Sequence, residues 1–322
     1  MDEINFIKRP RLRKPYFICA WPGMGEVAFK AVSYLVEQLK CEEFASIPGE
    51  EFFYLTSSLV TQGLLSIPEL PQSKFYYYKN KHGKNDLIVF LSNAQPDLVR
   101  ADIYSRRIIQ LAKRFKAGTV VSLASMPQAI DHTQEPGVWF AATSEENAGE
   151  LKKAGLNVLS EGAISGMNGL FLGIAKREGL NGFCLLGEIP LYTIQIENPK
   201  ASCAVLKAFS RISGIKVDLA GLETQAKNME QEINKLLDYL KLGTQAAGPI
   251  GEDDIEKIKD SLSQLTKLPL SIKSKIEDLF KQSRADISRA AQLKAELDKW
   301  NVYKDYEDRF LDLFKKKDEK KN

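Results

Sequence analysis

Residues 16–28 read Tyr16-Phe-Ile-Cys-Ala20-Trp21-Pro-Gly23-Met-Gly25-Glu-Val-Ala28. The first five residues are aromatic or apolar without polar alternation, which is typical of a strand covered on both faces of its sheet. A Pro-Gly turn follows, and apolar residues at helical spacing come after it. The segment therefore predicts a buried strand that turns directly into a helix.

The same pattern recurs along the chain. Further buried strands are predicted at 87–91, 119–123 and 183–186, and weaker strands at 43–47, 73–78 and 137–143. Helical patterns alternate with them at 24–39, 98–116, 165–178 and 199–213. Because alternating strands and helices are typical of layered α/β folds, we predict an α/β domain over residues 15–221 with a mostly parallel or mixed sheet.

The pattern changes after Gly214. Apolar residues then recur at heptad spacing, at Ile215, Leu219, Leu222, Ala226, Met229, Ile233, Leu236 and Leu240. Such an a/d seam is typical of a coiled coil. Further helices are predicted from Asp253 to Pro269, at 272–282 and at 284–316. We therefore predict an all-α extension over 222–316, a short solvated basic arm at 1–14 and a polar tail at 317–322.

Composition excludes several classes of protein. Among 322 residues, 45 are Lys or Arg and 42 are Asp or Glu, so the formal net charge is only +3. This balance predicts neither nucleic-acid nor anionic-lipid binding. No apolar run reaches the roughly 18 residues that a membrane span needs. Four scattered cysteines without a CxxC pair predict a reduced, cytoplasmic protein with no metal.

The glycines that follow the first strand fit the pattern of dinucleotide-binding loops, G-x-G-x-x-G/A, at Gly23, Gly25 and Ala28. However, Trp21 and Pro22 place a bulky ring and a rigid turn where a phosphate would enter. We therefore favour a tight strand-to-helix turn and predict no cofactor. A nucleotide- or small-molecule-binding enzyme that uses residues 23–28 and 162–169 is the alternative.

Two other segments are candidate sites. Glycines cluster at 162–169 before a helix, where they either cradle an anion or, as we favour, let the helix pack closely, with Ser165 as its N-cap. Glu188 ends a buried strand without a partnered acid, base or metal ligand, which favours a hydrogen bond between elements or subunits. The predicted ligand-binding residues are Trp21, Gly23, Gly25, Gly166 and Glu188.

No catalytic residue is assigned. The chain has two histidines, His82 and His132, and no G-x-S-x-G elbow, so a catalytic triad cannot be assembled from its motifs. Aromatic residues alternate across the predicted strand 73–78, which favours an edge or interface strand. The interface candidates are Tyr76, Tyr78, Leu222, Met229, Ile233, Leu236 and Leu240.

Six ordered blocks resemble the proteasome-assembly-chaperone-two (PAC2) family. They are Trp21-Pro-Gly-Met-Gly-Glu-Val-Ala-Phe29, residues 45–53, Ile67-Pro68 with Phe75-Tyr76, residues 87–96, residues 162–170, and Leu186-Gly-Glu-Ile-Pro-Leu-Tyr192 with Asn198-Pro-Lys-Ala201. The resemblance spans residues 15–221. It implies a phosphorylase-like α/β domain that forms homo-oligomers, with a trimer favoured and a protein as partner.

The resemblance also implies a role, which is assistance in assembling the proteasome core particle. Chaperones of this family dock through a C-terminal hydrophobic–Tyr–any tripeptide, whereas this sequence ends Lys320-Lys321-Asn322 and carries Val302-Tyr303-Lys304 internally. Docking by that route is therefore not expected. We predict a non-catalytic oligomeric scaffold or assembly factor.

Overall fold

The computed structural model describes residues 4–56, 58–61, 63–81, 83–243, 270–299 and 302–314. The chain divides into two compact units. One consists of Met1–Ile189 with Ile196–Gln231, and the other consists of Pro190–Gln195 with Glu232–Asn322. The first unit holds the α/β fold.

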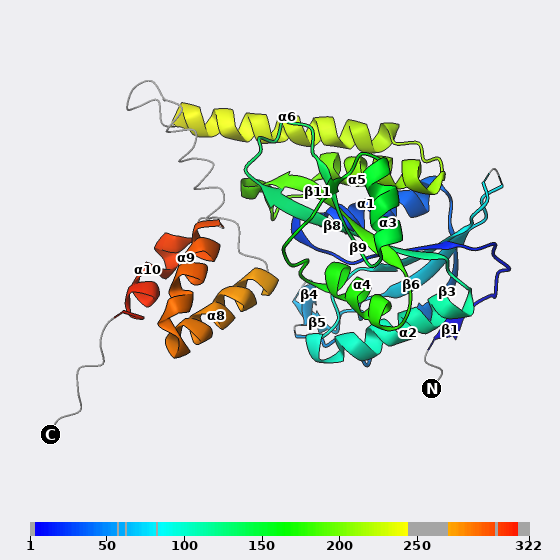
Figure 1. Cartoon of the computed structure of the whole chain (residues 1–322), viewed down its shortest axis with the longest axis horizontal. Coiled ribbons are helices and arrows are strands. Elements are labelled where there is room, and N and C mark those ends of the chain that lie inside the picture. The colour runs from blue at the N-terminus through cyan, green and yellow to red at the C-terminus, as the bar shows by residue number, and fades with distance from the viewer. Residues whose placement is uncertain are drawn as a thin grey trace. The chain divides into compact units, whose positions relative to one another are not determined.

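A nine-stranded mixed sheet forms the centre of the first unit (Figure 1). Its strand order is β1 (Asn5–Phe6), β3 (Glu42–Ile47), β6 (Ser73–Tyr78), β7 (Leu87–Ser92), β2 (Tyr16–Ala20), β8 (Thr119–Gln128), β11 (Gly182–Pro190), β9 (Val138–Ala142) and β10 (Asn157–Val158). Strands β7 and β8 both run parallel to β2 between them. The four runs predicted as buried strands are therefore neighbours in the middle of the sheet, which confirms the predicted α/β fold.

Helices cover both faces of this sheet (Figure 1). Helix α1 (Val27–Gln38) packs with α5 (Pro199–Ser213) on one face, and α2 (Ala101–Arg114) packs with α4 (Met167–Arg177) on the other. Successive β2 side chains show this alternation: the ring centroids of Tyr16 and Phe209 of α5 are 6.1 Å apart, and those of Phe17 and Phe171 of α4 are 6.3 Å apart. Both faces are buried, which is why β2 lacks polar alternation. Helix α3 (Glu145–Lys153) packs beside β9.

The structure corrects part of two sequence predictions for this sheet. The arm predicted to be solvated contributes edge strand β1, whose Asn5 and Phe6 pair with Ser46 and Ala45 of β3. Strand β6 is not an edge strand, because β3 and β7 flank it. Tyr76 and Tyr78 are half-buried on this inner strand, and their predicted role in an interface stays a prediction.

A two-stranded hairpin stands apart from the main sheet. Strand β4 (Leu59–Thr61) pairs antiparallel with β5 (Leu64–Ser66), and the two pair with no other described strand. The sequence pattern did not predict a strand in this segment. The apolar side chains of this hairpin are exposed to solvent.

The heptad pattern falls on helix α6 (Ala220–Gly243). Two seam residues, Leu222 and Ala226, are buried within the first unit, where Glu223 pairs with Lys207 of α5. Along the seam, Ile233 is buried and Met229 is half-buried, while the side chains of Leu236 and Leu240 lie outside the described residues. The buried Leu222 and Ala226 show that the first turns of α6 pack on their own domain. The helix predicted from Asp253 also lies outside the described residues.

Besides residues 190–195 and the end of α6, the described part of the second unit consists of short helices. They are α8 (Leu270–Ala285), the 3-10 turn η5 (Ile287–Arg289), α9 (Ala290–Lys299) and α10 (Tyr303–Leu311). The helical region predicted over 284–316 is divided into shorter elements, since Asp286 caps a new turn by accepting the Ser288 N–H. A bidentate Arg309–Glu277 pair joins α10 to α8, at 2.8 and 2.9 Å.

Candidate functional site

The carboxyl ends of β7, β2 and β8 meet at one edge of the sheet, because these strands are parallel. Ligands of open α/β sheets bind at this edge, where connections leave the sheet in opposite directions. Trp21 follows β2 at this edge, and the Gly166 segment opens α4 beside it. Trp21 and Gly166 therefore lie at the edge of the sheet where ligands bind in folds of this type.

The Trp21 ring lies in the hydrophobic core instead of facing a ligand. Its side chain is fully buried. Its ring centroid is 5.2 Å from that of Phe90, 5.4 Å from that of Phe171 and 6.4 Å from that of Tyr104. Such tilted and edge contacts stabilise aromatic clusters beyond simple burial. The ring therefore anchors the turn to the core.

Two amide side chains close the edge of the sheet. Asn168 accepts the Trp21 N–H and donates to the Trp21 carbonyl, with both distances 3.0 Å. Gln95, from the loop after β7, donates to the Pro22 carbonyl at 2.6 Å and accepts the Met167 N–H at 2.9 Å. These four bonds tie β2, β7 and α4 together. Neither residue is predictable from the sequence as part of this site, since nothing local marks their distant partners.

The turn after β2 depends on glycine. Gly25 has φ +62°, a left-handed conformation that glycine adopts without steric cost. A Cβ at Gly25 would lie 3.2 Å from Ile189, and the Gly25 carbonyl accepts the Asn198 N–H at 2.8 Å. Gly23 lies against the Asn168 amide, where a Cβ would be 3.4 Å from the nitrogen. This is the tight strand-to-helix turn that the sequence favoured.

The glycines before α4 permit close packing. Gly166 is the N-cap residue with φ +73°, so the predicted Ser165 cap is wrong. A Cβ at Gly169 would lie 2.0 Å from the Ile164 carbonyl oxygen, far inside any allowed contact. This close approach of Gly169 to Ile164 supports the interpretation that the glycines allow close packing, in preference to an anion cradle.

Glu188 is held by two donors from the neighbouring strand. Its carboxylate accepts the Gly137 N–H and the Trp139 Nε1–H, both at 2.7 Å, and its own N–H donates to the Gly137 carbonyl. The predicted hydrogen bond between elements is confirmed. The structure thus gives Trp21, Gly23, Gly25, Gly166 and Glu188 structural contacts, and their binding of a ligand stays a prediction.

We expect Glu188→Gln to lower the free energy of unfolding by about 1.5–3 kcal/mol, the usual worth of hydrogen bonds to a charged group. The new amide turns a donor toward one of the two N–H groups. Urea unfolding would measure the change. Glu161→Gln, at an exposed glutamate, is the matched control, and equal unfolding midpoints for the two variants would contradict the role of Glu188.

The two cysteines inside the sheet, Cys19 and Cys184, are poor nucleophiles. Burial raises the pKa of the Cys184 thiol to about 12 and that of Cys19 well above its ordinary value, so neither forms a thiolate at neutral pH. Within the described residues, no group of three or more His, Cys, Asp or Glu side chains is arranged to hold a metal ion. No described helix is long and apolar enough to span a membrane.

Known proteins are similar to this chain over the same region. The family model described as "PAC2 family" matches residues 17–237, which is more than half of the sequence and includes the sheet apart from strand β1, its flanking helices and the start of α6. The chain belongs to the PAC2 family. The resemblance predicted from six ordered blocks is confirmed.

Three similar proteins come from archaea. MJ1210, an uncharacterised protein of Methanocaldococcus jannaschii, is 30% identical over 241 residues, which cover 74% of this chain and 89% of the relative. PbaB of Pyrococcus furiosus, described as an archaeal proteasome activator, has a TM-score of 0.62 and 28% identity, covering 73% of this chain and 99% of PbaB. PbaA of the same organism, an archaeal homolog of proteasome-assembly chaperone, has a TM-score of 0.56 and 26% identity, covering 72% of this chain and 96% of PbaA.

Proposed function

We propose that this PAC2 protein is a non-catalytic, homo-oligomeric assembly factor that acts on a multi-subunit protein partner. The names of PbaB and PbaA connect those relatives to proteasome activation and assembly, and this chain aligns with nearly their whole length. A trimer is the oligomer that the family resemblance favours. A proteasome-like complex is accordingly the first partner to test.

One observation carries this proposal, an exposed apolar surface on the β4–β5 hairpin. Its large side chains are 53% to 79% exposed: Leu59, Val60, Leu64, Leu65 and Ile67. Between Phe52 and Gln72, Glu69 is the single charged residue. Soluble monomers rarely expose contiguous apolar surface of this kind.

Nearby residues extend this apolar surface. Tyr54 and Leu55 lead into the hairpin, while Leu98 and Val99 form an exposed turn at the start of α2. A hydrogen bond from the Asp97 N–H to the Phe52 carbonyl, 2.9 Å long, joins these two segments. We name these nine residues, five on the hairpin and four beside it, the hairpin surface.

A second subunit fits this surface better than a small ligand does. An isolated two-stranded sheet is marginally stable in water, so the hairpin gains stability when another chain covers it. Interfaces between identical subunits are apolar and depleted in charge at their centre, as the hairpin surface is. Tyr76, Tyr78, Met229 and Ile233 stay predicted interface residues alongside it.

Leu65→Glu tests this proposal by placing a charge in the interface. Burial of an unpaired carboxylate opposes association, and we expect the dissociation constant of the oligomer to rise at least about 100-fold, or about 2.7 kcal/mol. Sedimentation velocity over a concentration series would measure it. Ile7→Glu, at a similarly exposed apolar residue outside the hairpin surface, serves as control. Equal dissociation constants for the two variants would show that the hairpin is not part of the interface.

A further inference from the structure

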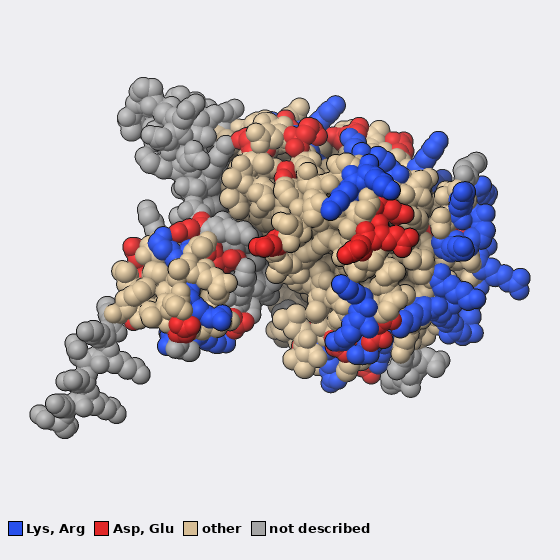
Figure 2. All heavy atoms as spheres, viewed as in Figure 1, with Lys and Arg blue, Asp and Glu red and all other residues tan. Residues whose placement is uncertain are grey.

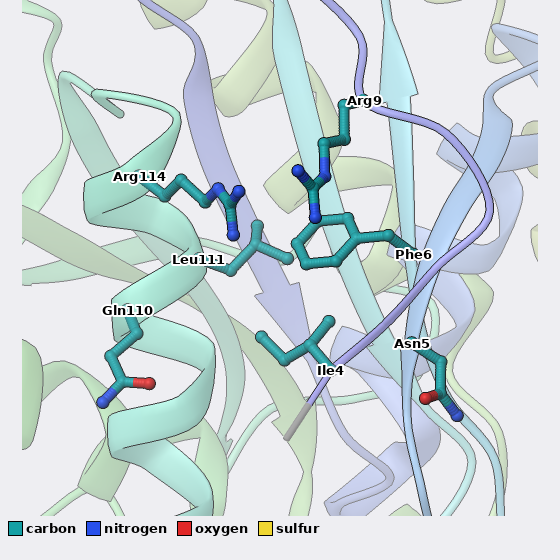
Figure 3. A pocket seen from close by; sticks show the side chains of 7 residues that line it. All are labelled: Ile4, Asn5, Phe6, Arg9, Gln110, Leu111 and Arg114. Atoms are coloured by element: carbon teal, nitrogen blue, oxygen red, sulfur yellow. The ribbon is translucent and has the colours of Figure 1, made fainter. Parts of the chain in front are cut away.

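A cavity of about 520 Å³ lies between the N-terminal arm and the last turns of α2 (Figure 3). Ile4 and Phe6 line it from the arm, and Leu111 lines it from α2. Figure 3 shows these three apolar side chains extending into a common space. The volume falls within the range of small-molecule sites, and the floor of the cavity is apolar.

Two arginines meet over this apolar floor. The guanidinium carbons of Arg9 and Arg114 each lie 5.1 Å from the centroid of the Phe6 ring. Twice 5.1 Å gives 10.2 Å as the largest separation that the two carbons can have. Figure 3 shows Arg9 reaching down from the arm and Arg114 reaching across from the helix, both toward Phe6.

Neither guanidinium is neutralised by a carboxylate among the residues that the structure describes. Other arginines nearby are paired: Arg13 with Asp86, and Arg106 with Asp102 and Glu178. Attraction to the ring of Phe6 holds each of these two cations in place. Two like charges over an apolar floor repel each other, and a bound anion between them would relieve that repulsion.

The helix end accounts for only one of these charges. Arg114 is the last residue of α2, where a cation interacts favourably with the helix dipole. That explanation does not extend to Arg9, which comes from a separate segment that is far away in the sequence. The helix dipole therefore does not explain why the Arg9 side chain also lies beside Phe6.

The cavity lies within a wider basic surface. The arm carries Lys8, Arg9, Arg11, Arg13 and Lys14, and the adjoining loop carries Lys79, Lys81 and Lys84. Arg13 donates to the Asn80 carbonyl at 2.6 Å, which joins arm and loop. Figure 2 shows Lys and Arg side chains gathered on this side of the molecule. Such a field raises the local concentration of anions.

We propose that this cavity binds a phosphate monoester that carries a small apolar body. A phosphate monoester has a charge of about −1.5 to −2 at pH 7, which matches two guanidinium groups better than a carboxylate does. Arginine also binds phosphate oxygens through two parallel N–H donors. The apolar body would lie against Ile4 and Leu111, and Asn5 and Gln110 also line the cavity.

A titration of the full chain with phenyl phosphate tests this proposal. Ligand-observed proton NMR would measure its dissociation constant, with inorganic phosphate and benzoate as competitors. We expect Arg9→Ala and Arg114→Ala each to weaken phenyl phosphate binding at least tenfold. Arg114→Lys, which keeps the charge but loses the two-donor geometry, should weaken it as well. Circular dichroism would verify that each variant is folded.

Arg11→Ala is the matched control, because Arg11 is an exposed arginine of the same arm that does not line the cavity. We expect it to change the dissociation constant less than twofold. An equal loss for Arg11→Ala and Arg9→Ala would overturn the site and leave only a general electrostatic field. Competition by benzoate as strong as that by phenyl phosphate would overturn the assignment to a dianion, and equal binding of inorganic phosphate would overturn the apolar contact.

Discussion

Asn168→Ala is expected to lower the free energy of unfolding by about 2–6 kcal/mol. The Asn168 side chain is buried, and it satisfies both the N–H and the carbonyl of Trp21. Removing the amide leaves two buried backbone groups without a hydrogen-bond partner, each costing roughly 1–3 kcal/mol. Urea unfolding followed by tryptophan fluorescence would measure the loss, since Trp21 is one of three tryptophans in the chain.

Asn147→Ala provides the control for this variant. Asn147 is also an asparagine near a helix N-terminus, but it is half-buried and its side chain makes one long bond to the Gly182 carbonyl, 3.3 Å. We expect a loss of about 1 kcal/mol or less. If Asn168→Ala were no more destabilising than Asn147→Ala, the closure of the sheet edge by Asn168 would be refuted.

Gly169→Ala is expected to destabilise the protein by about 3 kcal/mol or more. The added methyl group would lie 2.0 Å from the Ile164 carbonyl oxygen, so either the loop before α4 or the helix itself must move. Overpacking of this kind costs roughly 1–3 kcal/mol and occasionally more. Thermal unfolding would measure the effect.

The same helix supplies an opposite control. Gly173 lies on the exposed face of α4, and a Cβ there would meet nothing within 4 Å. Since glycine is a poor helix former, Gly173→Ala should stabilise the protein by about 0.5–1 kcal/mol. Effects of the same sign at the two positions would contradict the packing interpretation of the glycine segment.

The centre of the sheet could be predicted because its signal is local. Each of the four inner strands contains a short, mainly apolar run without regular polar alternation, because both faces are buried. Edge features carry no such signal. Strand β1 consists of Asn5 and Phe6, and it depends on pairing with β3. The hairpin β4–β5 lacks the polar alternation of a strand with one solvated face, because its apolar side chains are exposed on both faces.

The candidate site was predictable only in part. The glycines and Glu188 stand at visible turns and strand ends, so their positions were found from the sequence. Asn168 and Gln95 act on backbone groups 147 and 73 residues away, and no spacing rule connects such distant partners. The break in the predicted helix 284–316 did have a local signal, namely Asp286 followed two residues later by Ser288, a typical cap.

The mass of the full chain in solution tests the proposed oligomeric assembly factor most directly. Sedimentation equilibrium at micromolar concentration would measure it without labels or surfaces. We expect a multiple of the 36.1 kDa chain mass, with dissociation when Leu65 is replaced by Glu. A stable 36.1 kDa monomer throughout the concentration range would contradict the proposal.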